Sequence, residues 1–204
     1  MNPRAAIFDL GMVLSTPTGL YEGLARLLDT TPEAVEKGFW GAHRHAYDEG
    51  IPDRAYWESA LSLIEGHRVD DLDALLPELV TTDTGGWREI RDEARAILTD
   101  LGERGTRVFV LSNAPRSFAE TAPGFSWSSL VERFFFSGLL GVAKPSPEIY
   151  ARVESELGLP GESMWFVDDK PENVATASDR GWHAHLWVDD ADTRAWLTEE
   201  GFLS

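Results

Sequence analysis

Short apolar runs that end in polar residues recur along the chain and predict the strands of a buried sheet. Residues 5–8 (Ala-Ala-Ile-Phe) form such a run, and Asp9, Leu10 and Gly11 follow it. Continuous apolar runs bounded by turn residues are typical of strands covered on both faces, as in a parallel sheet. Four later runs have the same character, at residues 107–111, 134–136, 164–167 and 183–187. We therefore expect Asp9 at the carboxyl end of the first strand, where open α/β sheets bind their ligands.

The pattern between the first and second runs is helical. Leucines at positions 20, 24, 27 and 28 share one helix face. Further helix starts are indicated where a capping or turn residue precedes acidic positions, at Thr31-Pro32-Glu33, Ile51-Pro52-Asp53 and Val69-Asp70-Asp71. Residues 81–86 (Thr-Thr-Asp-Thr-Gly-Gly) predict a loop that ends this region as a hinge or a domain boundary.

After residue 86, helices alternate with the short apolar runs. An apolar stripe from Trp87 to Leu101 predicts one helix, and further helices are indicated at 147–157, 171–180 and 192–200. This alternation predicts an α/β fold, a doubly wound parallel sheet with a small all-helical cap inserted after the first strand. The expected domains are a core of residues 1–15 and 87–204 and a cap of residues 16–86.

Composition narrows the class of protein. The chain has 204 residues, of which 43% are hydrophobic and 26% charged, as expected for one globular domain or one domain with an insertion. No apolar run approaches the ~20 residues that span a membrane. There is no signal-peptide pattern and no cysteine, so disulfides and thiolate metal sites are excluded and we expect a cytoplasmic protein.

The net charge of −17 argues against nucleic acid or an anionic membrane surface as a partner. An anionic substrate would approach against this field, so its site needs a local cation from a metal, a lysine or an arginine. Lysine occurs only at positions 37, 144 and 170. The oligomeric state stays open between a monomer and a dimer.

Polar residues of particular kinds follow the later strands. Ser112 and Asn113 end the second strand, where a hydroxyl and backbone N–H groups suit an anion or simply cap a helix. Lys144 precedes a helix between a glycine-bearing turn and two prolines, a position that by itself is compatible with a solvated lysine. Asp168 and Asp169 end the fourth strand, and adjacent carboxylates either cap different groups or hold a cation such as Mg²⁺ between them.

Together these features resemble the haloacid dehalogenase-like (HAD) superfamily along essentially the whole chain. Phe8-Asp9-Leu10-Gly11 is similar to its first motif, Leu111-Ser112-Asn113 to its second, Lys144-Pro145 to its third, and Asp168-Asp169 through Asn173 to its fourth. The insertion falls where one subgroup carries a helical cap. The stretch from Tyr47 to Trp57 resembles the cap of bacterial α-glucose-1-phosphatase-like members.

The resemblance implies a Mg²⁺-dependent phosphatase that acts on a small phosphorylated metabolite such as a sugar phosphate. Asp9 would attack phosphorus and form an aspartyl phosphate. Mg²⁺ would be held by Asp9, the Gly11 carbonyl and Asp169 with Asp168 beside it, and Asn173 would support these ligands. The implied phosphate-binding residues are Ser112, Asn113 and Lys144, and Lys144 would also neutralise the nucleophile.

Gly11 departs from the family pattern. Most phosphatases of the family carry a second Asp there, which protonates the leaving group and later activates water. The α-glucose-1-phosphatase-like relatives share the Asp-Leu-Gly of this chain, so glycine does not imply an inactive enzyme. It predicts a preference for leaving groups of low pKa, such as the anomeric oxygen of a sugar 1-phosphate, an acyl phosphate or an aryl phosphate.

Two other functions remain open. A non-catalytic or nearly inactive member would keep the fold as a binding or regulatory protein. A dehalogenase would also use a lone Asp, but it needs no metal and would leave Asp168 and Asp169 without a role.

The cap is expected to select the substrate. Its candidate residues are His43, Arg44, His45 and Tyr47, which lie on or near one helix. His43 and His45 are two positions apart, so at most one of them would face the crevice.

Overall fold

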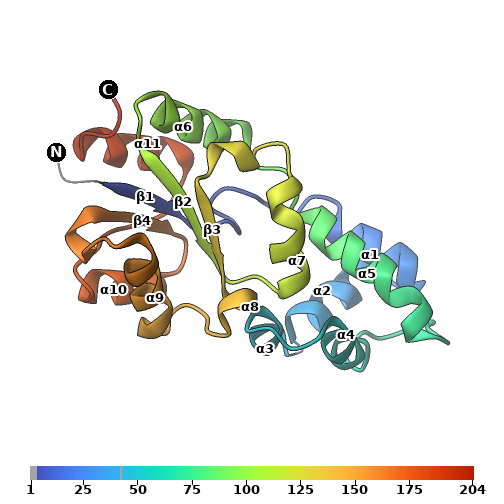
Figure 1. Ribbon diagram of the computed structural model, residues 1–204. Helices are drawn as coiled ribbons and strands as arrows, with labels where there is room; N and C mark the ends of the chain where they lie inside the picture. The colour runs from blue at the N-terminus through green and yellow to red at the C-terminus, as the bar shows by residue number, and fades with distance from the viewer. Residues whose placement is uncertain (1–3, 42) are drawn as a thin grey trace.

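The computed structural model describes residues 4–41 and 43–204 and contains one parallel sheet in the order β3-β2-β1-β4-β5 (Figure 1). Its strands are β1 (Ala5–Phe8), β2 (Arg107–Ser112), β3 (Arg133–Phe136), β4 (Met164–Asp168) and β5 (His183–Leu186). The first strand lies in the middle, paired in register with β2 on one side and β4 on the other. The predicted doubly wound α/β fold is confirmed.

The sheet separates two apolar layers because side chains alternate along each strand. Ala6 and Phe8 pack on one face with leucines of α6 (Asp92–Glu103) and α11 (Asp190–Glu199). Ala5 and Ile7 pack on the other face with α9 (Pro147–Leu157) and α10 (Pro171–Asp179). Figure 1 shows these helix pairs on opposite sides of the sheet. Burial of β1 on both faces explains its uninterrupted apolar sequence.

The remaining core helices are short. They are α7 (Arg116–Thr121), α8 (Ser137–Leu140) and the single 3₁₀ turns η1 (Ala122–Gly124), η2 (Ser128–Leu130) and η3 (Gly161–Ser163). None of the helices in the described residues is long and apolar enough to cross a membrane.

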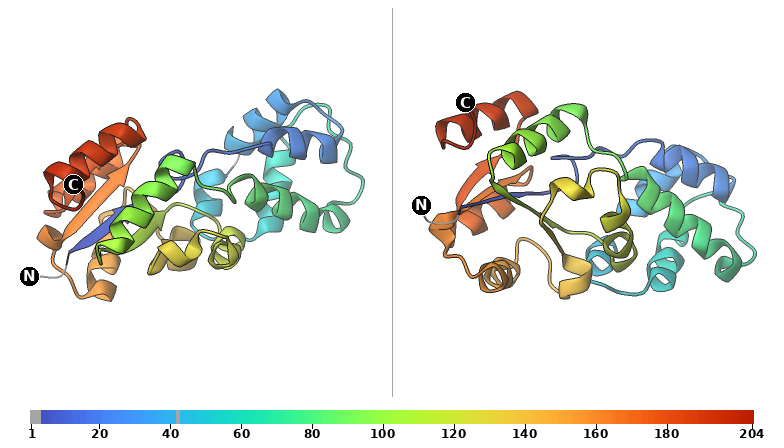
Figure 2. Two further views of the ribbon diagram at one scale, coloured as in Figure 1. Left: turned by 90° about the horizontal axis from the view of Figure 1, so that it is seen from above. Right: turned by 45° about the horizontal axis from the view of Figure 1, so that its top comes forward.

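Five helices between β1 and β2 form a second body beside the carboxyl ends of the strands (Figures 1 and 2). We call them the cap: α1 (Leu20–Leu28), α2 (Pro32–Gly41), α3 (Arg44–Asp48), α4 (Asp53–Leu61) and α5 (Leu72–Gly86). They enclose an apolar cluster of their own, which includes Leu24, Phe39 and Trp57. The exact domain boundaries at residues 15 and 87 stay a prediction.

The sequence prediction of a loop at residues 81–86 is wrong, because these residues form the last turns of α5. Thr84 donates its hydroxyl to the Val80 carbonyl inside the helix. Gly86 faces Leu20 so closely that a Cβ would lie 2.8 Å from the leucine side chain. Packing against α1 therefore overrides the low helix propensity of the glycine pair. The following helix, α6, begins at Asp92 and not at Trp87.

The two connections between cap and core are tied together. Ser15 is fully buried, and its hydroxyl bonds to the carbonyls of Trp87 and Glu89. The Thr18 N–H donates to the Gly86 carbonyl. Trp87 consequently lies at the junction and packs against both the core and the cap clusters.

Candidate active site

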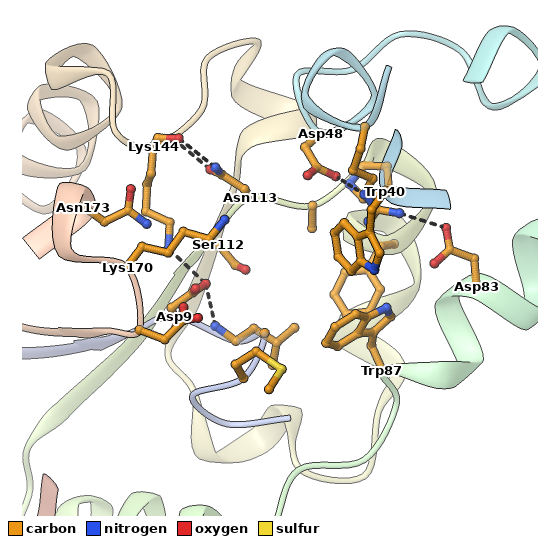
Figure 3. A pocket seen from close by; sticks show the side chains of 18 residues that line it. Asp9, Trp40, Asp48, Asp83, Trp87, Ser112, Asn113, Lys144, Lys170 and Asn173 are labelled. Atoms are coloured by element: carbon orange, nitrogen blue, oxygen red, sulfur yellow. Dashed lines mark hydrogen bonds and ion pairs between the residues drawn. The ribbon is translucent and has the colours of Figure 1, made fainter. Parts of the chain in front are cut away.

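The polar residues that follow the strands meet in one pocket between sheet and cap (Figure 3). Asp9 follows β1, Ser112 ends β2, and Asp168 ends β4. Since β1 is flanked by β2 and β4, these carboxyl ends lie side by side. This edge is the switch point of the sheet, where connections leave in opposite directions and a crevice opens.

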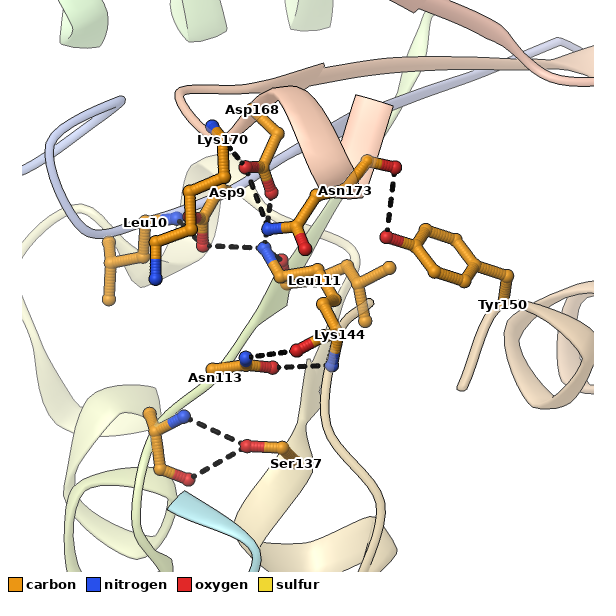
Figure 4. Close-up of polar contacts among 11 residues, drawn as sticks. Asp9, Leu10, Leu111, Asn113, Ser137, Lys144, Tyr150, Asp168, Lys170 and Asn173 are labelled. Atoms are coloured by element: carbon orange, nitrogen blue, oxygen red, sulfur yellow. Dashed lines mark hydrogen bonds and ion pairs between the residues drawn. The ribbon is translucent and has the colours of Figure 1, made fainter. Parts of the chain in front are cut away.

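Lys144 lies at the centre of the site, buried between two carboxylates (Figure 4). Its Nζ is 2.9 Å from Asp9 Oδ1 and 2.6 Å from Asp168 Oδ2. It also donates to the Leu111 carbonyl at 2.8 Å. Burial alone would lower the pKa of Lys144, but the charges of Asp168 and Asp9 outweigh it and raise that pKa above its usual value. The ammonium group is therefore a fixed positive charge against Asp9.

The backbone of Lys144 is held by the side chain of Asn113. The Asn113 amide donates to the Lys144 carbonyl and accepts from its N–H, each at 2.8 Å. Both ends of the amide are engaged, so Asn113 fixes the lysine loop through its side chain. Its backbone N–H remains the part of Asn113 that suits a bound anion.

Asp168 is fully buried and supported from the start of α10. Its Oδ1 accepts from the Lys170 N–H at 2.9 Å and from Asn173 Nδ2 at 2.8 Å. Asn173 is oriented in turn by Tyr150, whose hydroxyl donates to the Asn173 carbonyl. With one oxygen bonded to Lys144 and the other to α10, Asp168 is the most constrained acid of the site.

The acidic side chains have the composition of a divalent-cation site. Asp9, Asp168 and Asp169 each offer an oxygen, and these three atoms lie within 4.8 Å of one another. Three carboxylates and one ammonium leave two net negative charges. Asn173 Oδ1 is buried and has no hydrogen-bond partner among the described residues. Oxygen ligands with room for water suit Mg²⁺, and the unpartnered amide oxygen can accept from a water in such a shell.

Burial shifts the pKa values of two of these acids. It raises the pKa of Asp9 to about 6, with a further contribution from Asp168, while Lys144 and the Ser112 hydroxyl oppose the rise. Burial and the neighbouring Asp168 also raise the pKa of Asp169. A positive charge bound among the three carboxylates would favour their ionised forms.

Gly11 lines the pocket two residues after Asp9. A Cβ at this position would lie 3.6 Å from Trp87 Cζ3, which is ordinary van der Waals contact. The site therefore has space for a Cβ at residue 11, and the sequence does not supply one.

The cap side of the pocket contains a second charged cluster, made of Arg44, Asp48 and Asp83. Arg44 Nε is 3.1 Å from Asp48 Oδ1, and its Nη1 is 3.5 Å from Asp83 Oδ2. The guanidinium also lies 4.6 Å from the ring centre of Phe39. Burial raises the pKa of Asp83 to about 6 against the opposing charge of Arg44. Arg44 is thus already paired with two carboxylates.

The four cap residues proposed from the sequence lie in different environments. Arg44 lines the pocket, whereas His43 and His45 are exposed outside it, with His45 3.9 Å from Glu49. Tyr47 is buried, stacks on Tyr56 and contacts Ser117 of the core through its hydroxyl.

Sequence reasoning missed several pocket residues, namely Met12, Trp40, Asp48, Asp83, Trp87 and Lys170. Met12 follows the first motif and Lys170 lies within the fourth, whereas the other four come from distant parts of the chain. The spacing of Arg44 and Asp48, four residues apart, is the one local signal that pairs two of them.

Fold and site together define the class of protein. Residues 4–179 match the haloacid dehalogenase-like hydrolase family, and the chain belongs to that family of enzymes. The family resemblance noted in the sequence is confirmed. The phosphatase MT3486 of Mycobacterium tuberculosis is 28% identical over 208 residues, which cover 95% of this chain and 91% of that protein.

Two further proteins are similar over most of their length. The sesquiterpene phosphatase astK of Aspergillus oryzae is 28% identical over 185 residues, covering 85% of this chain and 84% of its own. A crystal structure of a HAD family enzyme from Bacteroides thetaiotaomicron, in complex with magnesium and inorganic phosphate, has a TM-score of 0.69. Its identity is 18%, with 91% of this chain and 94% of that chain covered, so it shows a shared fold.

Proposed function

We propose that this protein is a Mg²⁺-dependent phosphatase that hydrolyses the phosphate ester of a small metabolite through an aspartyl phosphate on Asp9. The observation that carries the proposal is the placement of Lys144 between Asp9 and Asp168, with Asp169 close by. This arrangement combines a nucleophile, a cation that stabilises phosphate charge, and oxygen ligands for a metal. The phosphatase names of the two similar proteins support it.

In the first step an Asp9 oxygen attacks phosphorus. Asp9 Oδ1 accepts from the Leu10 N–H at 2.7 Å and lies 2.9 Å from Lys144 Nζ, which leaves Oδ2 for the attack. A bond forms between Oδ2 and phosphorus while the bond from phosphorus to the ester oxygen breaks. Ser112 and the Asn113 N–H bind phosphoryl oxygens, and Lys144 offsets their charge.

A divalent cation fits beside these groups. Asp9, the Gly11 carbonyl and Asp169 would hold it directly, with Asp168 at its side and Asn173 supporting a bound water. When bound, Mg²⁺ reduces the repulsion between the Asp9 carboxylate and the phosphate. The magnesium and phosphate in the similar Bacteroides enzyme support this assignment.

In the second step water attacks the phosphorus of the aspartyl phosphate, and the bond to Oδ2 breaks. The carboxylate of Asp9 is restored and inorganic phosphate leaves. Overall, the ester and one water give an alcohol and phosphate, and the alcohol takes one of the protons of water. Gly11 supplies no acid for this proton, so leaving groups of low pKa should react fastest.

The site argues against the two other functions that the sequence leaves open. A dehalogenase requires no metal, and the net negative charge around Asp169 would then have no purpose. A non-catalytic protein would not need the buried lysine to be held against Asp9 from three sides. Both alternatives predict no phosphate release with Mg²⁺.

The test is phosphate release from a panel of esters with Mg²⁺ and with EDTA. We expect turnover with Mg²⁺, none with EDTA, and none from Asp9→Asn, because an amide is a poor nucleophile. Asp179→Asn, at an exposed position near the end of α10, is the matched control and should behave as wild type. Wild-type turnover by Asp9→Asn would rule out the aspartyl phosphate.

A further inference from the structure

The wall of the pocket opposite the nucleophile is apolar. Figure 3 shows the indole rings of Trp40 and Trp87 across the pocket from Asp9 and Ser112. Met12 and Phe118 line the same pocket. Trp40 and Met12 keep 47% and 43% of their surface exposed, so both present apolar surface that a ligand in the pocket can contact.

Hydrogen bonds within the cap direct the apolar part of Trp40 into the pocket. Its indole N–H donates to the Tyr21 hydroxyl at 2.6 Å, and this bond lies on the cap side. The surface that remains for a ligand is the carbon face of the ring. An indole face packs well against flat or cyclic apolar groups.

Met12 is placed in the pocket in spite of its backbone conformation. Its φ of 64° lies in the left-handed region, where glycine is favoured over a residue with a side chain. Arg91 donates to the carbonyls of Met12 and Val13 and pairs with Asp190, which holds this turn in place. Methionine is flexible and adapts to irregular apolar ligands.

The charged side chains on this side of the pocket are already paired, whereas the buried indole N–H of Trp87 has no hydrogen-bond partner among the described residues. Arg44 is paired with Asp48 and Asp83, and both ends of the Asn113 amide bond to the Lys144 backbone. A sugar would bring several hydroxyls against the tryptophan wall, where the carbon faces of the rings offer no hydrogen bonds in exchange for those with water.

From these features we infer that the substrate is the phosphate monoester of an alcohol or phenol whose organic part is a compact apolar ring that packs against Trp40 and Trp87. The inference rests on the proposed function and names its substrate class. The cavity of about 130 Å³ is close to the roughly 150 Å³ that accommodates a benzene ring, so its size limits the organic part to about one ring.

A matched pair of esters tests the inference. Cyclohexylmethyl phosphate and glucose 6-phosphate are both primary alkyl esters with a six-membered ring, and they differ mainly in hydroxyl groups. We expect kcat/KM with Mg²⁺ to be about tenfold or more higher for the cyclohexyl ester, since one unpaired buried hydroxyl commonly has an effect of that size. Trp40→Ala should bring the ratio close to one.

Leu63→Ala is the control, because Leu63 is an exposed apolar residue next to the cap helices and does not line the pocket. It should keep the wild-type ratio. A wild-type ratio near or below one overturns the inference, and so does a high ratio that Trp40→Ala leaves unchanged.

Binding separates this inference from the proposed function. Calorimetric titration of Asp9→Asn with the same two esters in Mg²⁺ should show about tenfold tighter binding of the cyclohexyl ester, and this result does not depend on turnover. If 4-nitrophenyl phosphate and both esters are inert towards the wild type, the proposed function fails. The relative affinities of the two esters for Asp9→Asn then test on their own whether the pocket prefers an apolar ring.

Discussion

Two buried clusters in this molecule each place one cation between two carboxylates, one in the core and one in the cap. In the core, Lys144 lies between Asp9 and Asp168, and in the cap, Arg44 lies between Asp48 and Asp83. The core cluster has a further acid, Asp169, and an amide oxygen of Asn173 without a partner. The cap cluster is instead surrounded by aromatic rings, including those of Phe39 and Tyr47.

The difference shows how similar groups serve different purposes. Asp9 and Asp168 stand at the ends of two paired strands, so backbone pairing fixes the positions of these acids. The excess negative charge of the core cluster can therefore persist until a cation binds. The cap residues come from helices α3 and α5, and their charges must be compensated within the cluster. We therefore expect the core cluster to respond to Mg²⁺ and the cap cluster to determine stability.

The largest expected effect comes from removing each cation. Arg44→Met leaves two buried carboxylates without their partner and should lower the free energy of unfolding by about 3 kcal/mol or more. Lys144→Met should have a similar effect without metal, but saturating Mg²⁺ should restore much of the loss. Chemical denaturation of both variants with Mg²⁺ and with EDTA measures this. Equal rescue of the two variants, or rescue of neither, would contradict the comparison.

The next effect concerns the acid that distinguishes the core cluster. Asp169→Ala should weaken Mg²⁺ binding by about 100-fold, the upper end of the effect of removing a residue that only supports a metal ligand. The fold should be retained because Asp169 is only half-buried. Calorimetry with Mg²⁺ measures the affinity, and Asp179→Ala serves as the control. Unchanged affinity would remove Asp169 from the metal site. Asp168→Ala should matter less for the metal than Asp169→Ala.

A smaller effect is the pH dependence of the cap. The pKa of Asp83 is raised to about 6, so the folded protein binds this proton more tightly than the unfolded chain, whose carboxyl has a pKa near 4. The contribution of Asp83 to stability is present below pH ~4 and is lost as the pH rises through ~6. The side chain of Asp83→Asn stays neutral at every pH. As the pH rises from ~4 to ~6, the free energy of unfolding of this variant should therefore increase relative to that of wild type by about 1–3 kcal/mol.

Chemical denaturation at several pH values tests the sign of this change. Asp70→Asn alters an exposed carboxyl of the same region, and its free energy of unfolding should differ from that of wild type by the same amount at every pH. If the difference for Asp83→Asn is independent of pH as well, the conclusion that the pKa of Asp83 is raised is wrong.

The smallest effect expected is at Gly11. Since a Cβ fits there, Gly11→Asp should introduce a proton donor and increase turnover of alkyl esters by roughly tenfold, with less effect on aryl esters. Gly11→Asn has the same shape without the proton and is the control. A leaving-group series at fixed pH measures, for each variant, how steeply the logarithm of kcat/KM depends on the pKa of the leaving group. An equal gain for alkyl and aryl esters would mean that protonation is not what residue 11 lacks.

The sheet and the residues at its edge could be predicted from the sequence because each depends on a local pattern. The apolar run of β1 and Asp9 directly after it occupy only five consecutive residues, so the pattern that predicts them is local. The pocket wall could not be predicted in this way, since Trp40 and Trp87 are 47 positions apart and meet only when the cap packs on the core.

The end of α5 was mispredicted for a related reason. Glycines 85 and 86 favour a loop by local propensity, but Gly86 is required by its contact with Leu20, and Asp83 is held in the helix by Arg44. Both contacts join residues that are distant in sequence. Similarly, local spacing placed His43 and Arg44 as equal candidates, and only the packing of α3 distinguishes the buried arginine from the exposed histidine.

The two tryptophans of the pocket belong to different bodies. Trp87 is anchored to the core through the Ser15 hydroxyl, while Trp40 lies on α2 of the cap. A ring that packs against this wall contacts both tryptophans only in the arrangement described here. Any affinity that it gains from Trp40 therefore also shifts the population of cap positions toward this arrangement by the same factor. Substrate recognition and cap closure would then be one equilibrium, and a substrate lacking the ring would leave the site open to water.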